Sequence, residues 1–204
     1  RAKTRAAIST IAARCMPGMV EEDAVAMARD VLAGEGMGRG WHDVYVRFGR
    51  NTLKTFGADS EPGVVLGTND IFFIDVGPVF GKFEGDGGDT FVTGSRPDLA
   101  QCATDAQKIF HIVRKEWENT KMSGKALYGF AAEQARLLGW ELNMDLSGHR
   151  LSDFPHAAIY DGPLADVDFS PSPLLWVLEI HIRHPQQLYG AFFEDMLLDD
   201  THFS

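Results

Sequence analysis

Apolar residues follow a helical period in the first part of the chain and a strand period after it. Alanine and isoleucine recur at helical spacing over residues 4–15, and a second run of this kind covers residues 21–33, so the sequence predicts a helical hairpin that turns at MPGM (16–19). VYVRF (44–48) alternates as a strand does. IFFI (71–74) is a continuous apolar run, which is typical of a strand buried on both faces. We therefore expect two helices followed by two strands.

The second part of the chain repeats this order. Pro97 suits the first turn of a long helix that we expect to end near residue 118. The next helical pattern, SGKALYGFAAEQARLLGW, should end at Gly139, because glycine commonly follows the last residue of a helix. Two strand patterns come last, LWVLEIHI (175–182) and LYGAFFEDMLL (188–198). The order of helices, strands, helices and strands predicts an α+β fold in which helices cover one face of a largely antiparallel sheet.

Composition narrows the classes of partner. Residues 1–204 are enough for one domain with a sizeable core. There are 19 Lys and Arg against 29 Asp and Glu, a formal net charge of -10, and no basic tract, which argues against nucleic acid as the main partner. No apolar run has membrane-spanning length, so we expect a soluble, cytoplasmic protein without a membrane partner. Cys15 and Cys102 lie far apart and outside any CxxC pattern, which indicates neither a disulfide framework nor a thiolate metal site.

The buried strand pattern ends in an acid that needs compensation. Asp75 follows the IFFI run directly, and a carboxylate at the edge of a core requires a partner, a hydrogen-bond network or a metal ion. If residues 71–91 form a β-hairpin with Phe80 and Gly81 at its tip, Asp75 lies directly opposite Asp86, with Cβ atoms about 5 Å apart. Two like charges at this distance repel each other, and a bridging divalent cation would turn the repulsion into chelation.

Asp89 is the rival of Asp86 for this role. In the hairpin register just described, Asp89 pairs with Phe72 and lies away from Asp75. We therefore favour Asp86 as the acid that faces Asp75.

The same geometry recurs near the end of the chain. With Gln186 and Gln187 at the tip of a second hairpin, Glu179 lies opposite Glu194. Any one such acid is most often a structural residue, but two opposed acidic pairs on apolar strands predict two metal ions about 3.5–4 Å apart, held by shared carboxylates. Oxygen-rich sites of this kind suit Mn, Co, Fe or Zn, and one imidazole commonly completes them. The candidates for that imidazole are His149 and His156, within SGHRLSDFPH.

These residues resemble the metal-binding set of a known family. The M24 metallopeptidases, which include methionine aminopeptidase, aminopeptidase P and prolidase, hold two metals with Asp, Asp, His, Glu and Glu, and the matching residues are Asp75, Asp86, His149, Glu179 and Glu194. The motifs CMPGMVEEDA, IDVG, EGDGGDTFVTG and FFEDMLL carry the resemblance over nearly the whole chain. The spacings of eleven residues between the aspartates and seven between the histidines are also kept. The resemblance implies a single catalytic domain with the pseudo-twofold pita-bread (creatinase) fold.

The resemblance also implies a function. It is that of an exopeptidase similar to aminopeptidase P or Xaa-Pro dipeptidase, which uses a hydroxide bridging two divalent ions to hydrolyse an N-terminal peptide bond. Glu179 would move the proton, and His156 would hydrogen-bond the oxyanion. The expected partner is a short peptide or a small amide as substrate. The sequence is compatible with a homodimer as well as with a monomer. The alternatives are a metallohydrolase or lyase that acts on another substrate and a catalytically silent peptide-binding homologue, although silent members of this fold usually lose metal ligands.

Two departures from the family pattern concern the substrate. The loop after the first strand, FGRNTLKTFG, lacks the histidine that family peptidases usually place there, and His42 is the nearest substitute. Arg150 stands beside His149 where relatives commonly keep glycine, and Phe192 replaces a prolidase arginine. The Arg150 guanidinium either points into the cleft and holds the carboxylate of a short substrate or turns outward to pair with Asp153. His42 and Arg150 are therefore the substrate-binding candidates.

Overall fold

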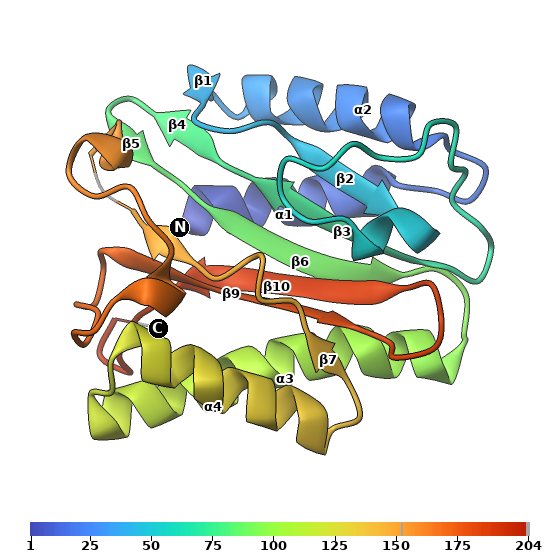
Figure 1. Cartoon of the computed structure of the whole chain (residues 1–204). Coiled ribbons are helices and arrows are strands. Elements are labelled where there is room, and N and C mark those ends of the chain that lie inside the picture. Colours follow the sequence, from blue (N-terminus) through green and yellow to red (C-terminus); the bar gives the residue numbers. More distant parts are fainter. Residues whose placement is uncertain (152, 203–204) are drawn as a thin grey trace.

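The computed structural model describes residues 1–151 and 153–202. Within them two helices are followed by a group of strands, and this order is repeated once, as predicted (Figure 1). The helices are α1 (Ala2–Arg14), α2 (Glu21–Gly34), α3 (Pro97–Thr120) and α4 (Gly124–Leu137). The strands are β1 (Arg39–Gly40), β2 (Tyr45–Phe48), β3 (Ile71–Val76), β4 (Pro78–Phe80), β5 (Phe83–Glu84), β6 (Gly87–Val92), β7 (Glu141–Leu142), β8 (His149–Arg150), β9 (Trp176–Arg183) and β10 (Gly190–Met196). The short 3-10 helices are η1 (Gly49–Leu53), η2 (His156–Ala158) and η3 (Leu164–Asp166).

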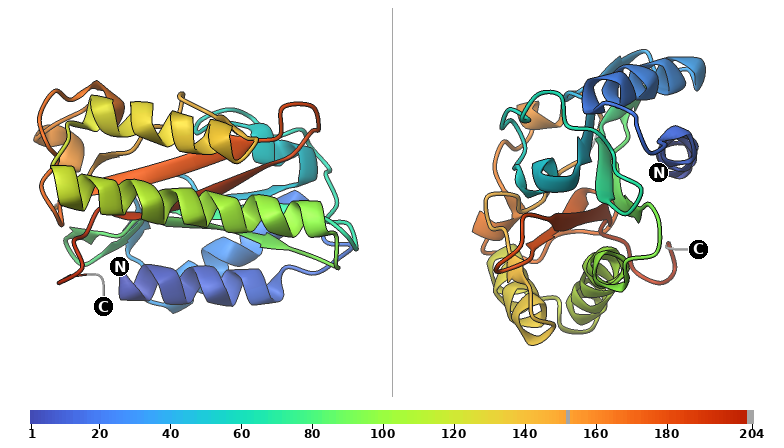
Figure 2. Two further views of the ribbon diagram at one scale, coloured as in Figure 1. Left: turned by 90° about the horizontal axis from the view of Figure 1, so that it is seen from below. Right: turned by 90° about the vertical axis from the view of Figure 1, so that its right-hand side faces the viewer.

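One antiparallel sheet runs through the molecule and joins two similar halves. Its strand order is β2-β3-β6-β10-β9-β7, with β8 also paired to β9, while β1, β4 and β5 form a small separate sheet. In the first half α1 and α2 pack on β2, β3 and β6, and in the second half α3 packs on β9 and β10 while α4 packs on β7 and α3. Figure 2 shows the helices along the outer side of the strongly curved sheet. This confirms the predicted α+β architecture.

The helices agree closely with the sequence patterns. Pro97 is the first residue of α3, and the backbone of Gly139 has a φ of 87° just after the end of α4. Cys15 and Cys102 are buried free thiols. No helix in the described part of the chain is both long enough and apolar enough to cross a membrane.

The register predicted for the first hairpin is wrong by two positions. Asp75 pairs with Gly88 rather than Asp86, and Asp89 pairs with Ile74 rather than Phe72. The turn causes this shift: Phe80 pairs with Phe83, so the tip is formed by residues 81 and 82, and Gly81 adopts a φ of 68° as the first residue of a two-residue turn. Since side chains alternate with a period of two, a shift of two positions keeps every residue on its predicted face. Asp75 and Asp86 therefore still share a face, but as diagonal neighbours.

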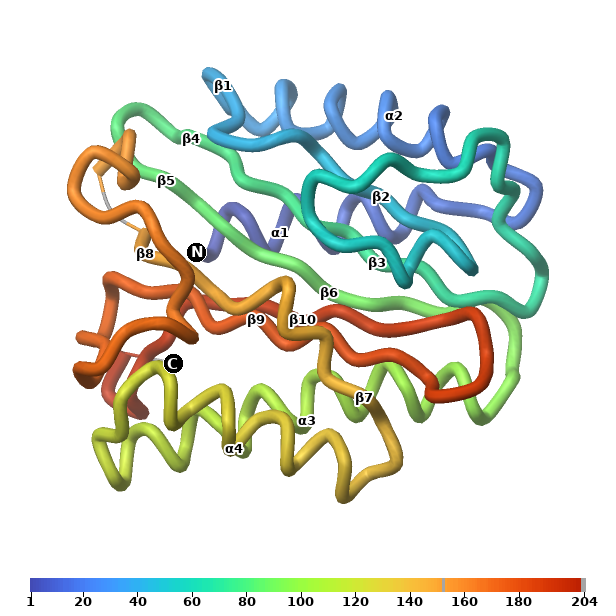
Figure 3. The backbone as a smooth tube through the Cα atoms, in the orientation of Figure 1, coloured from blue at the N-terminus to red at the C-terminus, as the bar shows by residue number. Residues whose placement is uncertain are grey.

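The register of the second hairpin is confirmed. Glu179 pairs with Glu194 in the β9–β10 ladder, and the pairing continues to Arg183 and Gly190 next to the turn. The two hairpins meet at a central seam, where Glu194 of β10 pairs with Gly88 of β6. Figure 3 shows β6 and β10 next to each other in the middle of the sheet.

Arg5 of α1 fastens this seam from the helical side. Its guanidinium donates to the carbonyl oxygen of Glu194 at 2.7 Å and to the carbonyl oxygen of Gly88 at 3.2 Å. It also lies 3.2 Å from a carboxylate oxygen of the buried Asp195. Because adjacent strand residues point to opposite faces, Asp195 faces the helix while Glu194 faces the other side of the sheet. The Arg5 guanidinium therefore joins α1 to both hairpins on the helical side of the sheet, opposite the face on which the Glu194 side chain lies.

A second buried acid anchors the loop after β2. The Glu21 side chain, at the start of α2, accepts hydrogen bonds from the backbone N–H of Phe48 at 2.6 Å and from the side-chain amide of Asn51 at 3.0 Å. Asn51 in turn accepts from the backbone N–H of Glu61 at 2.9 Å. These bonds hold η1 and the segment that follows it, which carries Phe56.

Replacing Glu21 by alanine should lower the free energy of unfolding by about 2–3 kcal/mol, because two buried donors lose a charged acceptor. Denaturant unfolding measures this loss. Asp23→Ala is the control, since Asp23 is exposed in the same first turn of α2 and should cost at most about 1 kcal/mol through the helix dipole. Equal losses for the two variants would contradict the anchoring role of Glu21.

Candidate metal centre

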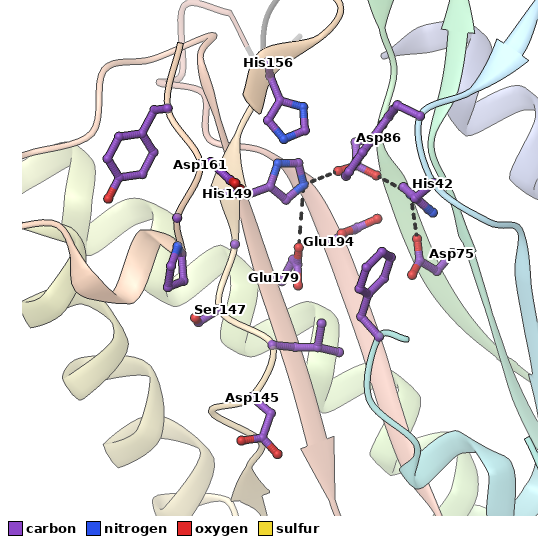
Figure 4. Close-up of a pocket in the computed structure, with 17 residues that line it drawn as sticks. His42, Asp75, Asp86, Asp145, Ser147, His149, His156, Asp161, Glu179 and Glu194 are labelled. Carbon is purple, nitrogen blue, oxygen red and sulfur yellow. Dashed lines mark hydrogen bonds and ion pairs between the residues drawn. The ribbon is translucent and has the colours of Figure 1, made fainter. Parts of the chain in front are cut away.

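A cavity of about 320 Å³ lies on the face of the sheet opposite the helices, between the two hairpins. The segment 145–149 and the segment 160–163 form one wall, and residues that precede β2 form another. The five predicted ligands line this cavity together with two further histidines (Figure 4): Asp75, Asp86, His149, Glu179, Glu194, His42 and His156. The structure thus brings together side chains that are up to 152 positions apart in the chain (42 to 194).

Four of these side chains are buried carboxylates. Asp75, Asp86, Glu179 and Glu194 are 7%, 3%, 7% and 2% exposed. Burial raises the pKa of Asp75 to about 6 and that of Glu179 to about 7, and it raises the pKa of Glu194 well above its ordinary value. Within the described residues, Oε2 of Glu179 and Oε1 of Glu194 are buried without a hydrogen-bond partner. Unpartnered carboxylate oxygens of this kind are the atoms to which a divalent cation binds.

Asp86 lies at the middle of the cluster. One oxygen, Oδ2, is 2.7 Å from Nε2 of His149, and the other, Oδ1, is 3.4 Å from Nε2 of His42. Burial raises the pKa of Asp86, but the neighbouring imidazoles of His149 and His42 outweigh this effect and hold the pKa below its ordinary value. Burial lowers the pKa of both imidazoles, yet the neighbouring carboxylates raise each of them to about 9.

His149 is oriented by its own backbone. Its Nδ1 is 2.7 Å from the carbonyl oxygen of Arg150, and since a carbonyl can only accept, Nδ1 carries the proton and donates. The Nε2 atom therefore faces Asp86 and lies 3.8 Å from Oε1 of Glu179. A histidine that donates through one nitrogen to a carbonyl and offers the other to a cavity is the usual arrangement of a metal ligand.

His156 lies beside this cluster and is held by an acid that the sequence patterns did not reveal. The His156 ring stacks on His149 with centroids 5.0 Å apart. Glu84 accepts from the His156 backbone N–H at 2.9 Å, and its second oxygen lies 3.2 Å from Nδ1 of His156. Burial lowers the pKa of His156, and His149 lowers it further. Glu84 lies only two residues before Asp86, but its role depends on contacts with His156 from a distant segment.

Trp41 is the second residue that sequence reasoning missed. Its ring lies 4.3 Å from that of His42, 4.8 Å from that of His149 and 4.8 Å from that of His156, measured between centroids. Its Nε1 donates to the carbonyl oxygen of Gly85 at 3.1 Å. Nothing in the sequence pattern singled out Trp41, because these contacts join segments from three parts of the chain.

The substrate-binding candidates fall in unexpected places. His42 contacts Asp75 and Asp86 and has a side chain only 4% exposed, so it belongs to the acidic cluster rather than to an outer substrate site. Arg150 is absent from the described residues that line the cavity, and as the strand neighbour of His149 it points to the opposite face. The loop without a histidine instead brings Phe56 to the cavity, 5.5 Å from His42 between ring centroids.

The comparisons with known proteins agree with this geometry. The family model described as metallopeptidase family M24 matches residues 1–198. This chain belongs to metallopeptidase family M24. No curated protein sequence matches the chain.

Solved structures of M24 enzymes have the same fold as this M24 chain. X-Pro aminopeptidase from Thermotoga maritima matches with a TM-score of 0.77 at 17% identity, over 97% of this chain and 58% of that one. Prolidase from Pyrococcus furiosus matches with a TM-score of 0.73 at 16% identity, over 96% and 57%. Methionine aminopeptidase from Thermotoga maritima matches with a TM-score of 0.69 at 12% identity, over 97% and 93%. The predicted pita-bread fold is confirmed, and the chain spans little more than half the length of the first two proteins.

The donor set of this M24 chain fits divalent metal ions. Four carboxylates and at least one correctly oriented imidazole face one cavity, and two carboxylate oxygens there lack any other partner. Asp89, the rival of Asp86, lies outside the set, because its carboxylate is on the helical side of the sheet, 3.5 Å from the Arg5 guanidinium.

Asp86→Asn should reduce bound metal at least tenfold, because the amide removes the charge that two imidazoles and the other acids surround. The measurement is Mn²⁺ or Co²⁺ content by elemental analysis after dialysis against a fixed metal concentration. Asp89→Asn is the matched control and should keep the wild-type content. Equal metal contents in the two variants would reject Asp86 as a ligand.

Proposed function

We propose that this M24 chain is the catalytic part of a metal-dependent exopeptidase that hydrolyses the first peptide bond of a short peptide, as aminopeptidase P and Xaa-Pro dipeptidases do. The observation that carries the proposal is the convergence of four buried carboxylates and His149, from both halves of the fold, on one cavity. The names of the M24 structures with the same fold support the peptidase class. The working compartment in this proposal is the cytoplasm.

In this proposal two divalent ions, Mn, Co, Fe or Zn, occupy the cavity. Asp75 and Asp86 would hold one ion, and Asp86, His149 and Glu179 the other, with Glu194 shared between them. When bound, such ions activate a water molecule as the nucleophile near neutral pH and polarise the scissile carbonyl. Glu179, one of the buried carboxylates of this set, would also take and return the proton of the nucleophile.

His156 and Glu84 act as a pair in this proposal. Because a carboxylate only accepts, Glu84 holds the proton on Nδ1 of His156, which leaves Nε2 as the atom that exchanges a proton. When Nε2 takes up a proton from solvent, the adjacent Glu84 carboxylate stabilises the imidazolium, and Nε2–H then donates to the developing oxyanion. Glu84 thus positions His156, and His156 contacts the substrate.

The size and charge of the cavity favour binding of the N-terminal end of a peptide substrate. A volume of about 320 Å³ is at the small end of the range for ligand pockets, so it admits one or two amino-acid residues. The acidic cluster attracts a free α-ammonium group, whereas an internal peptide segment brings no such charge. Trp41 and Phe56 provide apolar walls for a side chain or a proline ring.

The protein loaded with Mn, Co or Zn should hydrolyse Xaa-Pro dipeptides or short peptides with a free amine, and acetylation of that amine should lower kcat/KM by about 100-fold or more, since the ammonium loses its acidic partners. Product release measured by chromatography checks this. Cleavage of small amides alone would favour the non-peptide amide hydrolase, and peptide binding without turnover in any metal form would favour the silent homologue.

His156→Ala should keep the metal content of the wild type and lose kcat by roughly 100-fold, as expected for loss of an oxyanion donor. Glu84→Gln should lower kcat in the same direction, because a glutamine amide stabilises the imidazolium less and can hold the other tautomer. Steady-state kinetics and metal analysis are measured together. His149→Ala is the contrasting variant and should lose metal; identical metal contents in His149→Ala and His156→Ala would reject this division of roles.

A further inference from the structure

His42 occupies an unusual place among the acids of the cavity. It comes from the segment between β1 and β2, and its Nε2 lies 3.5 Å from Oδ1 of Asp75 and 3.4 Å from Oδ1 of Asp86 (Figure 4). Both separations are longer than a good hydrogen bond between these atoms. They match the distance of about 3.4 Å between two ligand atoms of a tetrahedral ion with bonds near 2.1 Å. Ligand atoms of His42, Asp75 and Asp86 also all lie within 4.8 Å of one another, which is close enough for one ion to contact all three residues.

The orientation of His42 repeats that of His149. Its Nδ1 lies 2.6 Å from the carbonyl oxygen of Asp43, the next residue, so Nδ1 carries the proton and Nε2 is free to bind a cation. His149 uses the carbonyl oxygen of its own next residue, Arg150, in the same way. The two imidazoles then face different oxygens of a single carboxylate, Oδ1 and Oδ2 of Asp86.

The backbone leaves room for this ring at one glycine. A Cβ atom added to Gly77 would lie 2.2 Å from Cδ2 and 2.3 Å from Nε2 of His42 and 2.5 Å from Nε1 of Trp41, which no real contact tolerates. The rings of Trp41 and Phe56 enclose the imidazole from two other sides, edge-on at 4.3 Å and 5.5 Å between centroids. Gly77 therefore makes the approach of His42 to the acids sterically feasible.

We propose that Nε2 of His42 is a direct ligand of the metal ion held by Asp75 and Asp86. This inference rests on the metal centre of the proposed function and adds a donor to it. Each of the two ions then has one imidazole, His42 on the Asp75 side and His149 on the Glu179 side, with Asp86 between them. Because imidazole favours Zn, Co and Fe over Mn and Mg, His42 makes the Asp75 side selective for the first group.

Proton NMR of the Co²⁺-loaded full chain tests this ligation directly. A histidine bound to Co²⁺ through Nε2 gives a strongly shifted, solvent-exchangeable Nδ1–H signal, and both Nδ1–H groups are shielded from exchange by their carbonyl partners. The wild type should show two such signals. His42→Gln should lose one of them and His149→Gln the other, while His156→Ala, the control, keeps both.

Calorimetric titration with Co²⁺ and with Mn²⁺ supplies the second readout. His42→Gln should weaken the binding of one of the two Co²⁺ ions by tenfold or more. It should change the affinity for Mn²⁺ less, because the variant removes a nitrogen donor. Gly77→Ala, whose Cβ would displace the rings of His42 and Trp41, should lose the His42 signal and keep the His149 signal, which keeps the test decisive if His42→Gln does not fold.

The outcomes separate this inference from the proposed function. Two bound Co²⁺ ions with a single shifted signal, lost only in His149→Gln, would overturn direct ligation by His42 and leave the metal centre standing. A wild-type protein that binds no Co²⁺ would overturn both proposals.

Discussion

Mutual repulsion among four buried carboxylates is the constraint around which this chain is organised. Asp75, Asp86, Glu179 and Glu194 are almost completely buried. Burial acts to raise the pKa of all four, and only in Asp86 do neighbouring histidines outweigh it. Such a cluster opposes folding, so the surrounding structure must hold it by other means. Two packed cores, one under each half of the sheet, supply the apolar burial that offsets this cost.

The two halves contribute equally to the centre, and its geometry depends on how they are joined. Each hairpin brings one pair of acids, and the pairs face each other only because β6 and β10 are neighbours. Arg5 holds that junction from behind through the carbonyl oxygens of Gly88 and Glu194. The positive charge that stabilises the junction thus lies on the helical side, and the face with the cavity stays strongly acidic.

Local patterns predicted most of the fold and part of the centre. The β9–β10 register followed from the placement of Gln186 and Gln187 at the tip of the hairpin, whereas the β3–β6 register missed the turn made by Gly81 and shifted by two positions. That error did no harm to the ligand prediction, because strand parity keeps Asp86 on the face of Asp75. Glu84 and Trp41 could not be found in this way, since their roles depend on contacts with His156 and His149 from distant segments. The two alternatives for Arg150 could not be decided from the sequence for a different reason: the alternation within β8, which places its side chain away from that of His149, appears only once that strand is known.

The contacts of Trp41 have a practical consequence. The other tryptophans, Trp117, Trp140 and Trp176, lie in the apolar core beneath the second half of the sheet. Trp41 alone among the four lines the cavity, where its indole touches three imidazoles whose charge changes with protonation or coordination. The molecule therefore carries an intrinsic optical reporter at its centre, and the ultraviolet emission of Trp41 can follow occupancy of the cavity without any added label.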